Sequence, residues 1–279
     1  MACQRREGHT PVSSFSTTPF LEGLPITLAA VAVLMAITFA VAIWRGHHSV
    51  IDVTWGLGFA VVALTALLAS SGHGNTTRRV LIAALTAAWG LRLAFHIGRR
   101  NWGKGEDPRY AALLAKAPGN PQLYALRMVY LTQGVVMWFV SLPVQVAMYE
   151  RSGPGVLTWV GTAIFAVGFF FEAVGDWQLT RFRNDPGSKD QVMDRGLWHY
   201  TRHPNYFGDA CVWWGLYLIA AQQWQGALTI LSTAAMTYTL ANGTGKPTLE
   251  KGMSERRPGY TEYVRRTSGF IPLPPRKLR

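Results

Sequence analysis

Long apolar runs constrain this chain more than any other feature, because few soluble folds could bury them all. The run from 25 to 44 has about 20 residues, the length an α-helix needs to cross a bilayer. Six more runs cover residues 50–70, 79–97, 122–149, 156–177, 206–222 and 225–241. We therefore predict an all-α, polytopic membrane protein whose seven transmembrane helices occupy residues 25–241.

The composition supports this class and removes others. Of the 279 residues, 49% are apolar and only 15% are charged, so little of the chain can form a soluble domain. The net charge of +12 therefore does not indicate a soluble basic surface. We therefore expect no nucleic-acid partner. The two cysteines, Cys3 and Cys211, give no disulfide framework, and the histidines show no metal-binding spacing. We expect no metal ion.

Two flanking segments lie outside the predicted spans. Residues 1–24 are rich in Ser, Thr and Pro, which predicts a disordered tail. Residues 242–279 are polar and basic, and we expect them to form a cytoplasmic segment that packs on the cofactor site. It should contain a short helix, a turn and an extended end over 270–275. The overlong fourth run contains Pro143, which predicts a kink or tilt.

The distribution of Lys and Arg between the connecting segments predicts the orientation. The N-terminal tail and the alternate loops on its side contain five of these residues, and the other loops with the C-terminal segment contain twenty. Because cytoplasmic loops carry the excess of Lys and Arg, the N-terminus should lie outside and the C-terminus in the cytoplasm. We expect a monomer in the inner membrane of a bacterium, with its active site facing the cytoplasm.

Ionisable side chains inside the predicted spans indicate a polar interior. A charge at the bilayer centre costs about 2.5–3.5 kcal/mol on insertion scales, so such groups face the bundle and find partners. Glu172 and Asp176 share a helix face and need cations opposite. Two interpretations stay open: ion pairs that only fix helix packing, or a cytoplasm-facing pocket for a charged cofactor. The residues concerned are Asp52, Arg92, His96, Arg127, Glu172, Asp176 and Asp209.

Residues 196–209 carry cations into the start of an apolar helix. Pro204 suits the first helical turn, and Asn205 and Asp209 share a face. A helix N-terminus favours anions, so this stretch could hold a nucleotide-like cofactor or could simply anchor the chain at the headgroups. Arg183 and Lys189 follow the acids of the preceding helix, where they suit phosphate groups.

Five stretches resemble the steroid 5α-reductase family, in particular its bacterial membrane-protein branch: residues 52–56, 105–110, 172–178, 202–209 and 260–272. The resemblance implies seven transmembrane helices and reduction of an activated C=C bond by NADPH, with a steroid-like or other lipid as substrate. It places Glu172, Asp176 and Arg183 on the cofactor and puts Asn205 and Asp209 at the nicotinamide. The complete cofactor set is His96, Glu172, Asp176, Arg183, Arg202, His203, Asn205, Tyr206 and Asp209.

The expected catalytic positions are Asp52 and Trp89, which fall where the family has a Glu and a Tyr that hold a steroid ketone. Because Trp has no labile phenolic proton, a lipid other than a steroid ketone is an equally good substrate. Asp52 is the first candidate for the proton donor, and Tyr130 or Tyr206 is the second.

Two other functions remain open. The Arg-His-Pro-x-Tyr-x-Gly stretch also resembles isoprenylcysteine and phospholipid methyltransferases, which use S-adenosylmethionine. A lipid-binding or scaffold protein without enzymatic activity would use the intramembrane charges only for packing.

Overall fold

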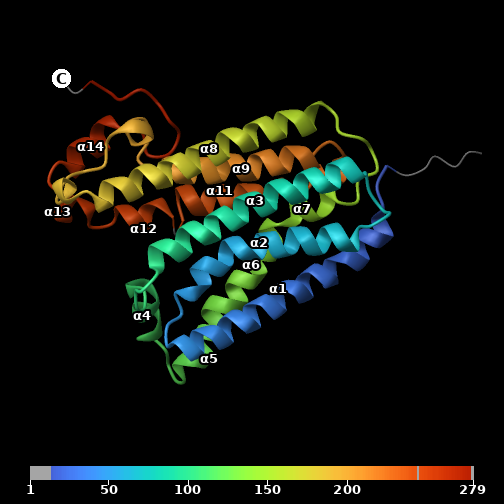
Figure 1. Cartoon of the computed structure of the whole chain (residues 1–279), viewed down its shortest axis with the longest axis horizontal. Coiled ribbons are helices and arrows are strands. Elements are labelled where there is room, and N and C mark those ends of the chain that lie inside the picture. The colour runs from blue at the N-terminus through green and yellow to red at the C-terminus, as the bar shows by residue number, and fades with distance from the viewer. Residues whose placement is uncertain (1–13, 244, 278–279) are drawn as a thin grey trace, which may run out of the picture.

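The long helices of the protein lie side by side in an elongated bundle (Figure 1). The structure, a computed structural model, describes residues 14–243 and 245–277. Within these ranges the chain is helical, and two isolated β-bridges take the place of any strand. The longer helices are α1 (Thr17–Arg45), α2 (Val50–Ala69), α3 (Thr76–Asn101), α8 (Val156–Asn184), α9 (Pro204–Ala220) and α11 (Ile230–Ala241).

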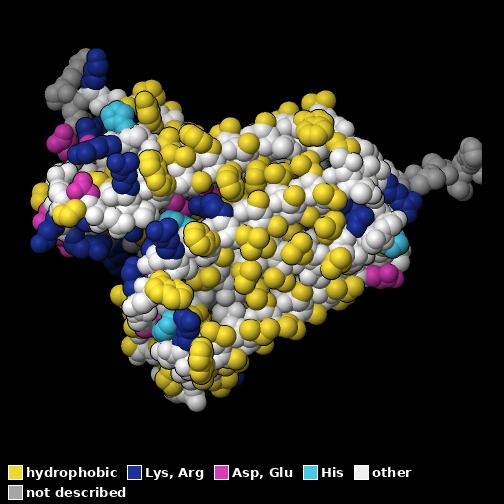
Figure 2. Space-filling view, viewed as in Figure 1, with side chains coloured by type: hydrophobic (Ala, Val, Ile, Leu, Met, Phe, Trp, Pro, Cys, Tyr) yellow, Lys and Arg dark blue, Asp and Glu magenta, His cyan; other side chains and the backbone are white. Residues whose placement is uncertain are grey.

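Five helical stretches are long and apolar enough to cross a membrane: α1, α2, α3, α8 and the continuous stretch Pro121–Val140. This confirms an all-helical protein of integral-membrane character. The predicted sixth and seventh spans correspond to α9 and α11, whose 17 and 12 residues fall short of the usual length of a transmembrane helix. Figure 2 shows apolar side chains over the middle of one face, with most Lys and Arg near α4 and α12–α14.

The predicted kink in the fourth run is confirmed. This run forms α5 (Pro121–Ala125), the π-helix η1 (Leu126–Leu131), α6 (Thr132–Val140) and α7 (Leu142–Ala147). Pro143 lies in the first turn of α7, and α6 ends at Val140 because a proline ring clashes with the carbonyl four residues earlier.

The N-terminal tail is shorter than the predicted 1–24. Helix α1 already begins at Thr17, because the helical pattern of the apolar run extends towards the N-terminus past Pro25, which lies inside the helix. The rest of the predicted tail, up to residue 13, lies outside the described residues. Helix α1 ends at Arg45 and is capped by Gly46, whose φ of 73° is left-handed and suits glycine.

Glycines spaced seven residues apart bring α8 and α9 into backbone contact. Gly161 and Gly168 on α8 face Gly215 and Gly208 on the antiparallel α9. A Cβ on Gly168 would lie 2.5 Å from the carbonyl oxygen of Gly208, and one on Gly161 would lie 2.5 Å from that of Gly215. Small residues allow this approach in membrane helices, and it brings the polar residues of both helices together.

The C-terminal segment packs over the ends of α8 and α9. It contains α12 (Lys246–Glu250), α13 (Met253–Arg256) and α14 (Tyr260–Arg266). The hydroxyl of Tyr263 donates to the Trp198 carbonyl (2.6 Å), and that of Thr201 donates to the Phe270 carbonyl (2.8 Å). The remaining short helices are α4 (Pro108–Leu114), η2 (Pro186–Ser188), η3 (Gly196–His199) and α10 (Trp224–Ala227).

Candidate functional site

Arg92 of α3 holds two carboxylates of α8 inside the bundle. Its guanidinium donates to Asp176 Oδ2 at 2.8 Å and also pairs with Glu172. The indole N–H of Trp89 donates to Glu172 Oε2 at 2.6 Å. Glu172 and Asp176 are 3% and 7% exposed, so this pairing supplies the cation that two acids on one helix face require.

Asp176 also joins α3 to α9. His96 Nε2 lies 3.6 Å from Asp176 Oδ2, and the Asn205 amide donates to Asp176 Oδ1 at 3.2 Å. The structure therefore brings together His96, Glu172, Asp176 and Asn205, four of the predicted cofactor residues. We call these four, with Arg92 and Asp209, the carboxylate cluster.

Asp209 completes the carboxylate cluster from α9. Its carboxyl is buried within electrostatic reach of Glu172, Asp176 and Arg92, and its Oδ1 accepts no hydrogen bond from the residues that the structure describes. The cluster therefore contains three carboxyls for one guanidinium, which leaves acceptor capacity for a ligand.

An aromatic layer closes the cluster on its inner side. The rings of Phe59, Trp89 and Trp213 lie 4.7–5.5 Å apart, and all three residues are fully buried. Trp89, a predicted catalytic residue, is fully buried, and its indole N–H orients Glu172.

Three arginines from separate elements lie near the C-terminal ends of α3 and α8. Arg183 lies within electrostatic reach of Arg100, Arg257 and Asp176, and it makes no hydrogen bond within the described part of the chain. We call Arg100, Arg183 and Arg257 the arginine group. Guanidiniums that face one another without enough acid between them are suited to bind phosphate.

Arg202 and His203, both predicted on the cofactor, hold the C-terminal segment in this structure. Glu250 Oε1 lies 2.9 Å from Arg202 Nε and 2.8 Å from His203 Nε2. Arg202 also donates to the carbonyls of Thr267 (2.6 Å) and Val264 (3.2 Å). These bonds make Arg202 and His203 positioning residues that fix α12 above the start of α9.

The Glu250 contact should make the C-terminal segment sensitive to acid. Burial alone would raise the pKa of Glu250, but hydrogen bonds from His203 and Arg202 outweigh it and bring the pKa from 4.5 to about 2. Because the folded-state pKa is lowered, this stabilisation is present above about pH 4.5 and is lost as the pH falls towards 2. We expect Glu250→Gln to raise the tryptic cleavage rate of the segment severalfold at pH 7, whereas Glu255→Gln on exposed α13 should leave it unchanged. Equal cleavage in both variants would contradict the role of this contact.

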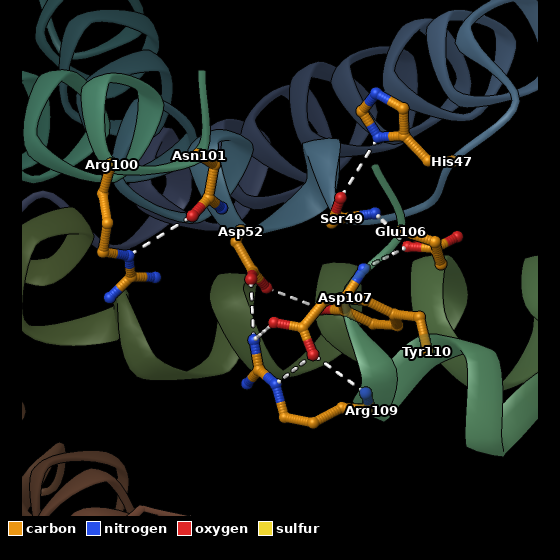
Figure 3. A network of polar contacts seen from close by, with 9 residues as sticks. All are labelled: His47, Ser49, Asp52, Arg100, Asn101, Glu106, Asp107, Arg109 and Tyr110. Carbon is orange, nitrogen blue, oxygen red and sulfur yellow. Dashed lines mark hydrogen bonds and ion pairs between the residues drawn. The ribbon is translucent and has the colours of Figure 1, made fainter. Parts of the chain in front are cut away.

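Asp52, the other predicted catalytic residue, lies in a different network (Figure 3). Its Oδ2 accepts from Arg109 at 2.8 Å and its Oδ1 accepts from the Tyr110 hydroxyl at 2.6 Å. Arg109 is also bonded to Asp107, whose pKa is lowered chiefly by this hydrogen bond. Asp52 is therefore not brought together with Trp89. Its hydrogen bonds with Arg109 and Tyr110 join the start of α2 to α4.

Glu106 extends the same network to the turn before α2. Its carboxylate accepts from the backbone N–H groups of His48 (2.6 Å) and Ser49 (3.0 Å), as Figure 3 illustrates for Ser49. Tyr130, one of the candidate proton donors, is fully buried, and its hydroxyl lies 3.0 Å from His48 Nδ1. Arg127, considered as a partner of the buried acids, is exposed and stays outside the carboxylate cluster.

Residues 38–267 match the model of a family described as "Protein of unknown function (DUF1295)". The chain belongs to this family. The match runs from the last third of α1 to the end of α14 and contains the whole carboxylate cluster. The DUF1295 chain is also 24% identical over 285 residues to a protein of Schizosaccharomyces pombe described as uncharacterized, covering 92% of this chain and 81% of the relative. No solved structure matches. Neither the description of the family nor that of the relative names an activity, so the resemblance to steroid 5α-reductases stays a prediction.

Several residues that build this site in the DUF1295 chain did not emerge from sequence reasoning. The seven-residue spacing of glycines on α8 and α9 was visible in the sequence and would have predicted the close helix contact. Arg100 and Arg257 gave no local signal, because cytoplasmic arginines are common for topological reasons alone. Glu250 reaches Arg202 across 48 residues, a distance that no periodicity describes.

Proposed function

We propose that the protein is a membrane-embedded reductase that binds NADPH at the carboxylate cluster and the arginine group. Hydride from this cofactor would reduce an activated C=C bond of a steroid-like or other lipid. The observation that carries the proposal is the adjacency of two oppositely charged regions. Buried acceptors from α8 and α9 lie next to guanidiniums from α3, α8 and the C-terminal segment.

The proposed membrane placement has seven spans, with α9 and α11 as the two short ones and the arginine group on the cytoplasmic side. Exposed tryptophans support this placement in the membrane, since Trp44, Trp102 and Trp177 lie near the ends of α1, α3 and α8, where tryptophan is common at the membrane–water interface. Trp177 is also covered by the guanidinium of Arg181, 5.8 Å from the ring centroid. Helix α8 has 29 residues, so its last turns would project beyond the bilayer.

The two regions suit the two ends of a dinucleotide. Carboxylates and the Asn205 amide can bond ribose hydroxyls and the nicotinamide carboxamide, whereas the arginine group can bind phosphates bidentately. The cofactor would supply the hydride. Arg92 would keep Glu172 and Asp176 ionised and oriented, and the aromatic layer would exclude water from behind.

The lipid would reach the cluster from the side. The side chains of Arg92 and His96 remain 19% and 23% exposed, although Glu172 and Asp176 behind them are buried. On the face shown in Figure 2, charged and histidine side chains lie among apolar ones between α8 and α3. An apolar substrate could therefore approach the cofactor without leaving the bilayer.

A methyltransferase is the second candidate, because the carboxylate cluster has more acids than cations. The sulfonium of S-adenosylmethionine carries a positive charge that such a cluster would stabilise, and the resemblance of residues 202–208 to methyltransferases points the same way. Thermal unfolding with NADPH, NADH or S-adenosylmethionine separates the candidates, since a ligand at about 100 Kd stabilises by roughly 2.7 kcal/mol. A response to S-adenosylmethionine alone would reject the reductase, and a response to none would favour a scaffold.

The corresponding variant experiment addresses cofactor affinity. Asp176→Asn removes the acceptor shared by Arg92 and Asn205, and Arg183→Gln removes the unbonded guanidinium. Because a charged hydrogen bond contributes about 1.5–3 kcal/mol, we expect each to weaken NADPH binding at least tenfold. Arg181→Gln, two residues earlier on α8 and exposed, is the matched control. NADPH titration by isothermal calorimetry gives the affinities, and parent-like affinity in Arg183→Gln would remove the phosphate role.

A further inference from the structure

We propose that Tyr206 is the catalytic residue that gives a proton to the substrate oxygen, an assignment that rests on the proposed reductase function. Reduction of an enone needs a hydride at one carbon and a proton at the carbonyl oxygen. Sequence reasoning leaves three donors open: Asp52, Tyr130 and Tyr206. The contacts of their oxygens separate them.

The first two candidates are committed to other contacts. Both carboxylate oxygens of Asp52 accept hydrogen bonds, one from Arg109 and one from Tyr110, so neither is free to present a proton to a ligand. Tyr130 has no exposed surface, and its hydroxyl is engaged with His48.

Tyr206 differs in both respects. It is half-buried in the first turns of α9, and its hydroxyl makes no hydrogen bond within the described part of the chain. The ring stacks on His203 with centroids 5.5 Å apart and an interplanar angle of 12°, which fixes its direction. His203 is in turn held by Glu250. The phenol is thus rigidly placed while its donor stays unused.

The charges around Tyr206 suit a group between cofactor and substrate. It lies within electrostatic reach of two acids, Asp209 and Asp176, and of two arginines, Arg109 and Arg100. The acids belong to the carboxylate cluster, which would hold the nicotinamide end of the cofactor and stabilise its positive charge after hydride transfer. The positive charge of the arginines would stabilise the oxygen that becomes negative when the phenol loses its proton.

Hydride from NADPH adds to the β-carbon of the enone and breaks the C=C π bond, while the Tyr206 proton passes to the carbonyl oxygen. NADPH is oxidised, and the substrate is reduced to its enol. The enol takes a proton from water at the α-carbon and returns its hydroxyl proton to the tyrosinate, which gives the saturated ketone. The net reaction consumes one NADPH and one proton.

The test compares Tyr206→Phe with Tyr217→Phe, which removes a hydroxyl from the same helix that donates only to the Ala227 carbonyl. The parent is first assayed with a panel of long-chain enones, and the one reduced fastest is kept. We expect Tyr206→Phe to lower kcat about a hundredfold or more, with NADPH affinity within twofold of the parent, and Tyr217→Phe to behave as the parent.

A spectroscopic measurement without cofactor provides the second readout. The absorption of the bound enone should move to longer wavelength when its carbonyl accepts a hydrogen bond, and this shift should vanish in Tyr206→Phe alone. A parent-like shift and kcat in Tyr206→Phe would overturn the proton-donor assignment while leaving the reductase intact. Loss of NADPH affinity with an unchanged shift would likewise overturn it and make Tyr206 a cofactor contact. A parent that reduces no enone and binds no NADPH would overturn the proposed function itself, and this assignment with it.

Discussion

Arg92→Met is expected to destabilise the protein by about 3–5 kcal/mol, because it leaves Glu172 and Asp176 buried without their cation. Met fills a similar volume, so the loss of stability would come from the unpaired buried acids and not from a cavity. The apparent unfolding temperature in detergent, followed by tryptophan fluorescence, should fall well below that of the parent. NADPH binding should be lost at the same time, since both acids would then turn from the site or become neutral.

The matched control for this substitution is Arg99→Gln, which removes an exposed arginine from the same helix. A second comparison combines Arg92→Met with Glu172→Gln and Asp176→Asn. Replacing all three charges removes the unpaired acids, so the triple variant should recover much of the stability of the parent without recovering NADPH binding. If Arg92→Met alone is as stable as Arg99→Gln, the ion pairs do not hold α3 to α8.

The faces of single helices were predictable from the sequence, since they depend only on periodicity. Pro204 was expected in the first turn of a helix, and α9 begins there. Arg92 and His96 were expected on one face, and both reach Asp176. The need for a cation opposite Glu172 followed from the four-residue spacing of the two acids.

Which helices become neighbours was not predictable in the same way. Both Arg92 and Arg127 were reasonable partners for the buried acids, because periodicity orients a side chain without naming the helix it meets. Arg92 is the partner of these acids in the structure, because close glycine contacts at two helix interfaces determine which helices are neighbours. Gly56 and Gly90 bring α2 against α3, and the glycines of α8 and α9 bring those helices together.

The role of Asp52 shows a second limit of sequence reasoning. An acid in the first turn of an apolar helix was expected at membrane depth, where a lone carboxyl suggests chemistry. Helix α4 supplies Arg109 and Tyr110 to this carboxyl, and the loop that leads from α3 to α4 has no periodic pattern to reveal its path. A local motif therefore identified the residue but not its partners.

Gly168→Ala should have the second large effect, because it separates the two helices that carry most of the carboxylate cluster. The added Cβ would lie 2.5 Å from the Gly208 carbonyl oxygen and 2.6 Å from the Val212 nitrogen. Both are backbone atoms that move only with α9 itself. We expect a loss of about 1–3 kcal/mol in stability, as for other overpacked sites, and a large loss of NADPH affinity as Asn205 moves away from Asp176.

Gly98→Ala is the control, since it adds the same methyl group to a glycine of α3 whose nearest neighbour, a Val53 methyl, would lie 3.8 Å from the new Cβ. That contact is ordinary, and alanine favours a helix over glycine by about 1 kcal/mol, so Gly98→Ala should be neutral or stabilising. Thermal unfolding and NADPH titration of the two variants decide the point. Because the glycine contacts determine how far Asp176 lies from Asn205, equal behaviour of both variants would show that close packing of α8 on α9 is not what assembles the site.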